Sequence, residues 1–181
     1  FDFSFEWKIV AGCNSGVKYR VADYSGAILG LEYQVLDDAK WKYAPDRLGA
    51  TASIYAVKGA SSDKQLQPPG EFNKSRIVAK GKKLEHWLNG ERVLSFDYTA
   101  AKWAEYVKLL GIRGGNLTGR NGKLWLQDHG QDVWFRNLRM RVIPDKETIT
   151  PDPDFVPMAV TGRALEKEQA RVKKMLKPIK K

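Results

Sequence analysis

The chain has 181 residues, of which 43% are hydrophobic and 29% charged, so it can bury a core and has the composition of a globular protein. It contains no run of about 18 apolar residues and one cysteine, Cys13, which excludes a membrane-spanning helix, an internal disulfide and a thiol-based zinc site. Residues 162–181 contain eight Lys or Arg and two Glu, so they carry about six of the ten formal net positive charges. We therefore expect no nucleic-acid binding by the body of the chain.

Alternating apolar and polar residues predict strands along most of the chain up to Pro144. The clearest case runs from Phe1 to Ile9, where an aromatic or aliphatic residue stands at every second position. Turns rich in Gly, Asn and Pro separate the segments, and the pair Asn89-Gly90 predicts a type I′ hairpin. The expected strands cover residues 1–9, 17–21, 32–37, 51–57, 73–80, 82–88, 92–96, 123–127 and 133–142.

Two helices are expected beside these strands. One runs from Thr99 to Leu110, with Thr99 as its N-cap, and the other from Arg163 to Leu176. Pro144 ends the compact part, and the polar stretch with prolines that follows it is typical of a linker or of an arm lying on the domain surface. We therefore expect one all-β domain over residues 1–144, a two-sheet antiparallel sandwich, followed by a linker and a basic, partly helical tail over residues 145–181.

The segment from Glu32 to Asp37 carries a polar pair that could form part of a site. Because side chains alternate along a strand, Glu32 and Gln34 point to the same face. Asp37 is an odd number of residues from Glu32 and points away from it. A carboxylate and an amide on one concave face could bind a hydroxylated ligand, but the same alternation is found on any solvated sheet face.

Three further residues suit proton transfer or charge stabilisation. His86 and His129 are the only side chains here with an ordinary pKa of about 6.5. His86 shares a strand face with two leucines, which also suits a hydrogen-bonded core histidine, and His129 lies in a turn that it could simply stabilise. Arg20 could donate to an oxygen of a ligand or form a salt bridge with Glu32 across adjacent strands.

Six short motifs stand in order between Phe1 and about Ile143: Asn14-Ser15-Gly16-Val17 with Arg20, Glu32-Tyr33-Gln34-Val35-Leu36-Asp37, Gly70-Glu71-Phe72-Asn73, Glu85-His86-Trp87-Leu88-Asn89-Gly90, Leu126-Gln127-Asp128-His129-Gly130 and Val133-Trp134-Phe135-Arg136-Asn137. Together they resemble the 3-keto-disaccharide hydrolase family, which implies a concanavalin A-like jelly-roll fold. Phe72 stands where the family commonly has tryptophan. Members usually begin with further strands upstream, so the chain is expected to be N-terminally incomplete.

The resemblance implies a carbohydrate-active enzyme that cleaves the glycosidic bond of 3-keto-glycosides. A ketone at carbon 3 acidifies the proton on carbon 2, so a general base can remove it, the anomeric substituent can leave and water can add. The expected base is Glu32 or His86, with Arg20 as a donor to the sugar. The substrate-binding residues expected from the resemblance are Gln34, Asn14, Ser15, Gln127 and His129. Tyr55, with Trp41 and Trp125, is a candidate for stacking on a sugar, although such aromatic residues more commonly pack in the core.

Two other functions fit the same residues. The sandwich could be a non-catalytic carbohydrate-binding module, or the basic tail could bind a partner. Oxygen and imidazole ligands are available at Glu32, Asp37, Asp128 and His129, but their spacing does not show convergence, so neither a metal nor a cofactor is assigned. The resemblance favours a periplasmic or extracellular location, and the sequence leaves the oligomeric state open.

Overall fold

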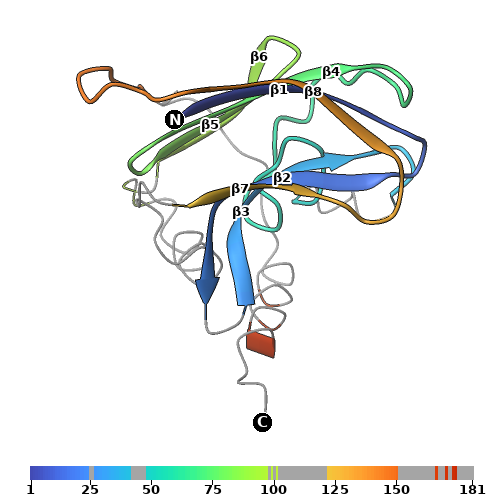
Figure 1. Ribbon diagram of the computed structural model, residues 1–181, viewed down its shortest axis with the longest axis horizontal. Helices are drawn as coiled ribbons and strands as arrows, with labels where there is room; N and C mark the ends of the chain where they lie inside the picture. The colour runs from blue at the N-terminus through green and yellow to red at the C-terminus, as the bar shows by residue number, and fades with distance from the viewer. Residues whose placement is uncertain are drawn as a thin grey trace.

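The computed structural model describes residues 1–24, 27–41, 48–97, 99, 101, 122–150, 166, 170, 173 and 174. These residues form two stacked antiparallel sheets (Figure 1). One has five strands in the order β6-β5-β4-β1-β8 and the other has three in the order β3-β2-β7. The strands are β1 (Asp2–Ile9), β2 (Asn14–Tyr24), β3 (Ala27–Leu36), β4 (Asn73–Lys80), β5 (Lys83–Leu88), β6 (Glu91–Asp97), β7 (Lys123–Gln127) and β8 (Val133–Arg141). The expected all-β sandwich is confirmed.

The local turn and alternation signals also agree with the structure. Asn89 and Gly90 both have positive φ, 49° and 93°, and join β5 to β6 as an antiparallel pair. In β1 the burial alternates at every residue, so that Phe3, Phe5 and Trp7 enter the core. The bounds of β1, β5 and β6 therefore follow from side-chain alternation and turn chemistry. β2 and β3 are longer than the expected strands over residues 17–21 and 32–37, and cover Asn14–Tyr24 and Ala27–Leu36.

The expected strand over residues 51–57 is wrong. This part of the chain, which we call the 50–58 segment, turns back on itself and makes only isolated bridges, from Tyr33 to Ile54 and from Ile54 to Lys58. Ala52 and Ala56 have φ values of 66° and 58°, a left-handed conformation that no regular strand contains. The segment nevertheless lies against β3, because the amide of Ala52 donates to the carbonyl of Gln34 at 2.9 Å.

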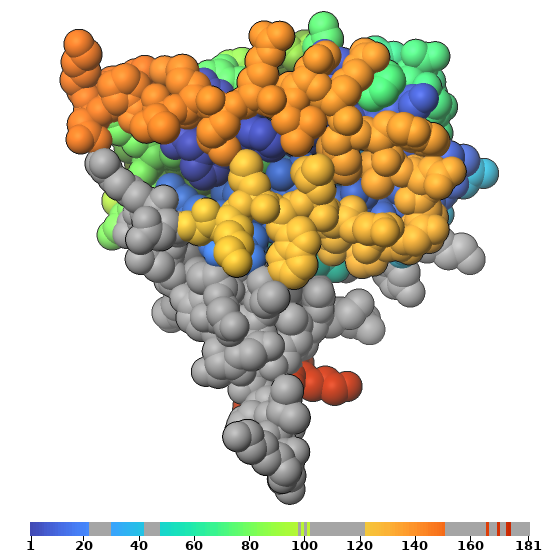
Figure 2. Space-filling model, viewed as in Figure 1, coloured from blue at the N-terminus to red at the C-terminus, as the bar shows by residue number. Residues whose placement is uncertain are grey.

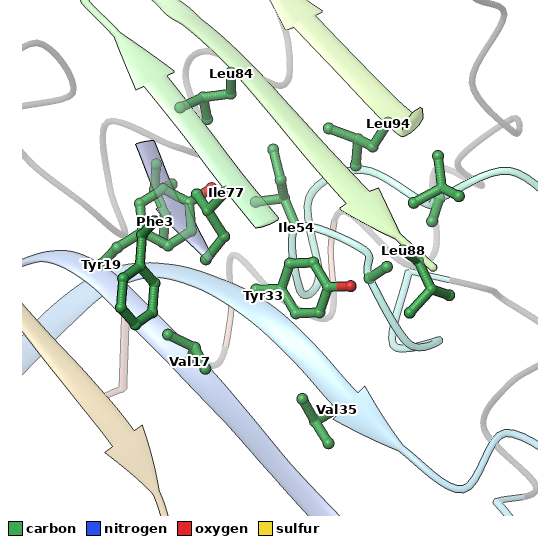
Figure 3. Close-up of a cluster of buried hydrophobic side chains, with 14 of the residues drawn as sticks. Phe3, Val17, Tyr19, Tyr33, Val35, Ile54, Ile77, Leu84, Leu88 and Leu94 are labelled. Carbon is green, nitrogen blue, oxygen red and sulfur yellow. The ribbon is translucent and has the colours of Figure 1, made fainter. Parts of the chain in front are cut away.

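The hydrophobic core fills the space between the two sheets (Figure 3). Tyr19 and Tyr33 from the three-stranded sheet face Ile77, Leu84 and Leu88 from the five-stranded sheet. The Tyr33 hydroxyl contacts Ser75 Oγ at 2.8 Å, so the polar end of the ring has a partner inside the core. Because side chains alternate along a strand, the neighbours of Tyr19 and Tyr33 in sequence point to the opposite face of the three-stranded sheet, away from this core.

The side of the sandwich formed by β7 and β8, which we call the open side, exposes apolar side chains. Figure 2 shows β8 in orange and β7 in yellow along this side, with blue atoms of the N-terminal strands visible between them. Leu124, Leu126, Leu138 and Met140 are 38–48% exposed. Apolar side chains on β7 and β8 are therefore more exposed than the core residues of β1–β6.

Truncating a side chain at the centre of the core should destabilise the fold far more than truncating one on the open side. Ile77→Ala is expected to lower the free energy of unfolding by about 2–5 kcal/mol, because Ile77 is fully buried and its loss leaves a cavity. Urea denaturation measures this difference. Leu138→Ala, at a side chain 46% exposed, is the matched control and should cost less than about 1 kcal/mol; equal costs at the two positions would contradict this packing.

The chain beyond β8 begins as an arm on the domain surface. Lys80 Nζ donates to the carbonyls of Pro144 and Asp145 at 2.6 and 2.9 Å, and Lys83 Nζ to the carbonyl of Ile149 at 3.1 Å. Of the helix expected from Thr99, only residues 99 and 101 are described, and of the tail helix only residues 166, 170, 173 and 174. Within the described residues, no helix has the length and apolar character needed to span a membrane.

Asp2 joins β1 to both of its neighbours and should make the stability depend on pH. Hydrogen bonds from Arg76 (2.7 and 2.8 Å) and Arg141 (3.0 Å) hold the pKa of Asp2 below its ordinary value of 3.8. A depressed folded-state pKa stabilises the protein above the unfolded-state pKa, and this contribution disappears as the pH falls through the folded-state pKa. Urea denaturation of Asp2→Asn should therefore show a loss of stability at pH 7 that becomes smaller below about pH 4. An equal loss of stability at pH 7 and below about pH 4 would contradict this role.

Candidate functional site

The outer face of the three-stranded sheet carries the polar side chains predicted from β3. Strand register places Gly16 between Gln34 and Gln127, and Lys18 between Glu32 and Trp125. Residues directly opposite each other in antiparallel strands share a face. We call this set the polar face; its members are Asn14, Gly16, Lys18, Glu32, Gln34, Trp125 and Gln127.

Glu32 and Gln34 are buried at the centre of the polar face, with 4% and 2% exposure. Glu32 Oε2 lies 3.8 Å from Lys18 Nζ, so a cation stands beside the carboxylate. Gln34 Nε2 donates to Asn14 Oδ1 at 2.9 Å, which fixes the amide. The buried oxygen Gln34 Oε1 has no hydrogen-bond partner among the described residues, although such atoms usually find one.

Gly16 leaves room for two side-chain oxygens to lie close to the backbone of β2. A Cβ atom at this position would lie 2.8 Å from Glu32 Oε1 and 2.9 Å from Gln127 Oε1. Gly16 does not have a positive φ, so its backbone conformation does not require glycine. A glycine inside a strand often marks close approach by another group, and here that group is the pair formed by the carboxylate and the amide.

Gln127 and Trp125 extend the polar face onto β7. Gln127 Oε1 is a second buried oxygen without a hydrogen-bond partner in the part of the chain that the structure describes. Ser15 faces the opposite way and donates from Oγ to the carbonyl of Gln127 at 2.7 Å, which ties β2 to β7. The Trp125 side chain is 45% exposed, so its ring is available for stacking on a sugar.

Arg20 does not join Glu32 on the polar face. A register shift between Tyr19 and Ala22 forms a bulge, and Arg20 has a φ of 53°. Its guanidinium donates from Nη2 to the carbonyl of Gly81 at 2.9 Å, on the turn between β4 and β5. Among the described residues, Lys18 is a cation that lies beside Glu32.

His86 lies in the core, between the two sheets. Its side chain has 0% exposure, Nε2 is 2.9 Å from the Tyr19 hydroxyl and Nδ1 is 2.7 Å from the carbonyl of Ala52. Burial, with a smaller contribution from the nearby Lys58 ammonium, lowers the pKa of His86 to about 3 against the opposing effect of the hydrogen bond to Ala52. The ring is therefore neutral at physiological pH.

The other expected residues surround the polar face without meeting at its centre. Tyr55 lies in the 50–58 segment, and its amide donates to the carbonyl of Glu32 at 3.0 Å. His129 is exposed in the turn between β7 and β8. Asp37 accepts from the amide of Gly12 at 2.8 Å, so it holds a turn. Among the described residues, no three His, Cys, Asp or Glu side chains gather closely enough to hold a metal ion.

Sequence reasoning missed two members of the polar face, Lys18 and Gly16. Alternation along β2 could have found both, because they stand at even spacing from Asn14, and a glycine inside a strand was a second signal. The bulge at Arg20 leaves no such signal, since no glycine or proline marks it.

Comparison with known proteins gives relatives for most of the chain. Residues 1–141 match the 3-keto-alpha-glucoside-1,2-lyase-like domain. A 3-keto-disaccharide hydrolase from Bacteroides thetaiotaomicron is 30% identical over 172 residues; the match covers 79% of this chain and 58% of the relative. The chain thus spans a little over half the length of that protein.

Two crystal structures from Parabacteroides distasonis, both of proposed glycosyl hydrolases, are also similar. The first has a TM-score of 0.65 at 33% identity and covers 76% of this chain and 67% of the other. The second has a TM-score of 0.59 at 26% identity and covers 78% and 77%. The match of the family model over residues 1–141 and the agreement in fold lead to one conclusion: the chain belongs to the family of 3-keto-alpha-glucoside-1,2-lyase-like domains.

Proposed function

We propose that the protein cleaves the glycosidic bond of 3-keto-glucosides on the polar face, with Glu32 as the general base. The observation that carries the proposal is the pair of buried amide oxygens of Gln34 and Gln127, which lack hydrogen-bond partners among the described residues and flank the Glu32 carboxylate. Unsatisfied buried acceptors are costly, and sugar hydroxyls are donors that would satisfy them. The family membership and the name of the relative from Bacteroides thetaiotaomicron support the same substrate class.

The reaction begins at carbon 2 of the oxidised sugar. Glu32 takes the proton from carbon 2, and the electron pair of the broken C–H bond passes to the oxygen on carbon 3 to form an enolate. When the ketone re-forms, a double bond forms between carbons 1 and 2 and the bond from carbon 1 to the leaving oxygen breaks. The leaving oxygen takes up the proton held by Glu32, directly or through water, which releases the aglycone as an alcohol and restores the carboxylate. Water then adds a hydroxyl to carbon 1 and a proton to carbon 2, so the net change is hydrolysis.

Lys18 is the residue that we expect to stabilise the enolate. Its ammonium lies beside the Glu32 carboxylate at 3.8 Å, so a ligand oxygen bound next to Glu32 would also be close to a cation. Fixed charge at the position where negative charge develops is a large contribution to catalysis. In this role Lys18 replaces Arg20, whose guanidinium donates to Gly81.

The experiment is to incubate the protein with a 3-keto-glucoside that carries a chromogenic aglycone and to follow aglycone release. Lys18→Met should reduce kcat by about 10²-fold or more, as the removal of one transition-state donor does elsewhere. Lys8→Met is the matched control on the other sheet, where the ammonium lies over the Trp134 ring, and should leave kcat unchanged. Equal rates for the two variants would contradict the role of Lys18.

Calorimetry separates the enzyme from a carbohydrate-binding module on the same fold. An enzyme should bind the 3-keto-glucoside and release the aglycone, whereas a module should bind a glycan without forming a product. Binding without product by the wild-type protein would therefore contradict the proposed activity.

A further inference from the structure

We infer that His86 is a positioning residue that fixes the strand carrying Glu32 and Gln34, and that it does not itself exchange protons with the substrate. His86 lies on β5 in the five-stranded sheet, whereas Glu32 lies on β3 in the other sheet. Any influence of the imidazole on the polar face must therefore pass through the groups that it contacts. The inference rests on the function proposed above.

The contacts of His86 determine which ring nitrogen carries the proton. A carbonyl oxygen can only accept, so Nδ1 is protonated and donates to the carbonyl of Ala52 at 2.7 Å. Nε2 is then the acceptor of a hydrogen bond that the Tyr19 hydroxyl donates, with 2.9 Å between the oxygen and Nε2. Tyr19 lies on β2 and Ala52 in the 50–58 segment, so one imidazole holds the two chain segments that flank β3.

Ala52 occupies a conformation that needs support from its surroundings. Its φ of 66° is unfavourable for a residue with a Cβ atom, and such residues persist where neighbouring contacts hold them. The bond from His86 Nδ1 to the Ala52 carbonyl is a contact of this kind. It acts together with the backbone hydrogen bonds between the 50–58 segment and β3.

The 50–58 segment in turn sets the backbone of both residues at the centre of the polar face. The Ala52 amide donates to the carbonyl of Gln34 at 2.9 Å, and the Gln34 amide donates to the carbonyl of Ser53 at 3.2 Å. The Tyr55 amide donates to the carbonyl of Glu32 at 3.0 Å. Loss of the bond at Ala52 would thus loosen β3 at two positions, and a small displacement of a reacting group can cost a large factor in rate.

The test compares His86→Leu with Leu94→Ala in the full chain. Leu94 pairs with His86 across β5 and β6 and is equally buried, so the control matches the loss of core packing while it keeps the hydrogen bond from His86 to Ala52. Amide hydrogen exchange measured by nuclear magnetic resonance should be about tenfold faster for Ala52 and Tyr55 in His86→Leu than in Leu94→Ala. His86→Asn, which keeps a donor near the Nδ1 position, should restore most of the protection.

The kinetic readout distinguishes positioning from proton transfer. For a positioning residue, kcat falls in His86→Leu while the midpoints of its pH profile stay in place; loss of one limb of the profile would overturn the inference. Equal amide exchange in His86→Leu and Leu94→Ala would also overturn it. If wild-type protein turns over no 3-keto-glucoside, the proposed function fails while the exchange data still decide the inference. His86→Gln, which keeps a polar group near Nε2 and loses the Ala52 bond, serves if the leucine variant does not fold.

Discussion

Glu32→Gln is expected to reduce the turnover of a 3-keto-glucoside by about 10²- to 10⁴-fold, the contribution that a positioned general base makes. The amide has the shape of the carboxylate but cannot accept the proton from carbon 2. The fold should survive, because the partner ammonium of Lys18 is partly exposed and can be hydrated. Steady-state kinetics and urea denaturation of the same preparation would measure both effects.

Glu85→Gln provides the matched control for this result. Glu85 is also a buried strand glutamate with a cationic partner, but it lies on the five-stranded sheet and accepts from Arg92 Nη1 at 3.1 Å and from Trp87 Nε1 at 2.9 Å. We expect Glu85→Gln to leave kcat unchanged. Turnover that survives in Glu32→Gln, or falls equally in both variants, would mean that Glu32 is not the base.

Gly16→Ala is expected to reduce turnover by about 10²-fold while the protein stays folded. The new methyl group would lie 2.8 Å from Glu32 Oε1 and 2.9 Å from Gln127 Oε1, so one or both side chains must move. A displacement of about 1 Å at a reacting group can cost a factor of this size. Because Gly16 does not have a positive φ, alanine fits the strand backbone, and reduced freedom of the unfolded chain offsets part of the steric cost.

The same substitution at Gly49 tests whether the effect belongs to the polar face. A Cβ atom there would lie 3.6 Å from the Tyr55 ring, an ordinary van der Waals contact, and Gly49 has no positive φ. Gly49→Ala should therefore keep both stability and kcat close to the wild-type values. If Gly16→Ala were as active as Gly49→Ala, the positions of Glu32 and Gln127 close to Gly16 would have no part in catalysis.

Side-chain alternation predicted the parts of the fold that depend on regular strands. It put Phe3, Phe5 and Trp7 on one face of a strand, which the structure buries in the core, and it put Glu32 and Gln34 together on one face of β3, as the structure does. The face is set by the two-residue period of a strand, so a local pattern is enough to predict it.

Departures from regular pairing could not be predicted in this way. The 50–58 segment alternates like a strand in sequence, yet Ala52 and Ala56 adopt positive φ, held by contacts with β3 and His86 that lie far away along the chain. The bulge at Arg20 likewise turns that side chain from Glu32 toward Gly81. Both depend on tertiary contacts rather than on local sequence.

The position of His86 shows how the pattern and the family resemblance lead to different expectations. Alternation placed it with Leu84 and Leu88, and all three are buried in the core. The resemblance suggested a base at the site, but the protonated nitrogen donates to Ala52 and the other accepts from Tyr19. Only the structure shows that these two contacts reach the strand that carries Glu32.

Turnover of a 3-keto-glucoside in deuterated water tests the central claim most directly. Elimination and hydration on the polar face should deliver one solvent deuteron to carbon 2 of the product. Carbon 4 is the internal control, because spontaneous enolisation exchanges its proton as well as that of carbon 2; at early times carbon 4 should keep its proton. Glu32→Gln should form neither the product nor the label. A wild-type product that keeps its original proton on carbon 2 would contradict the account, because the bond would then have been cleaved without proton removal by Glu32.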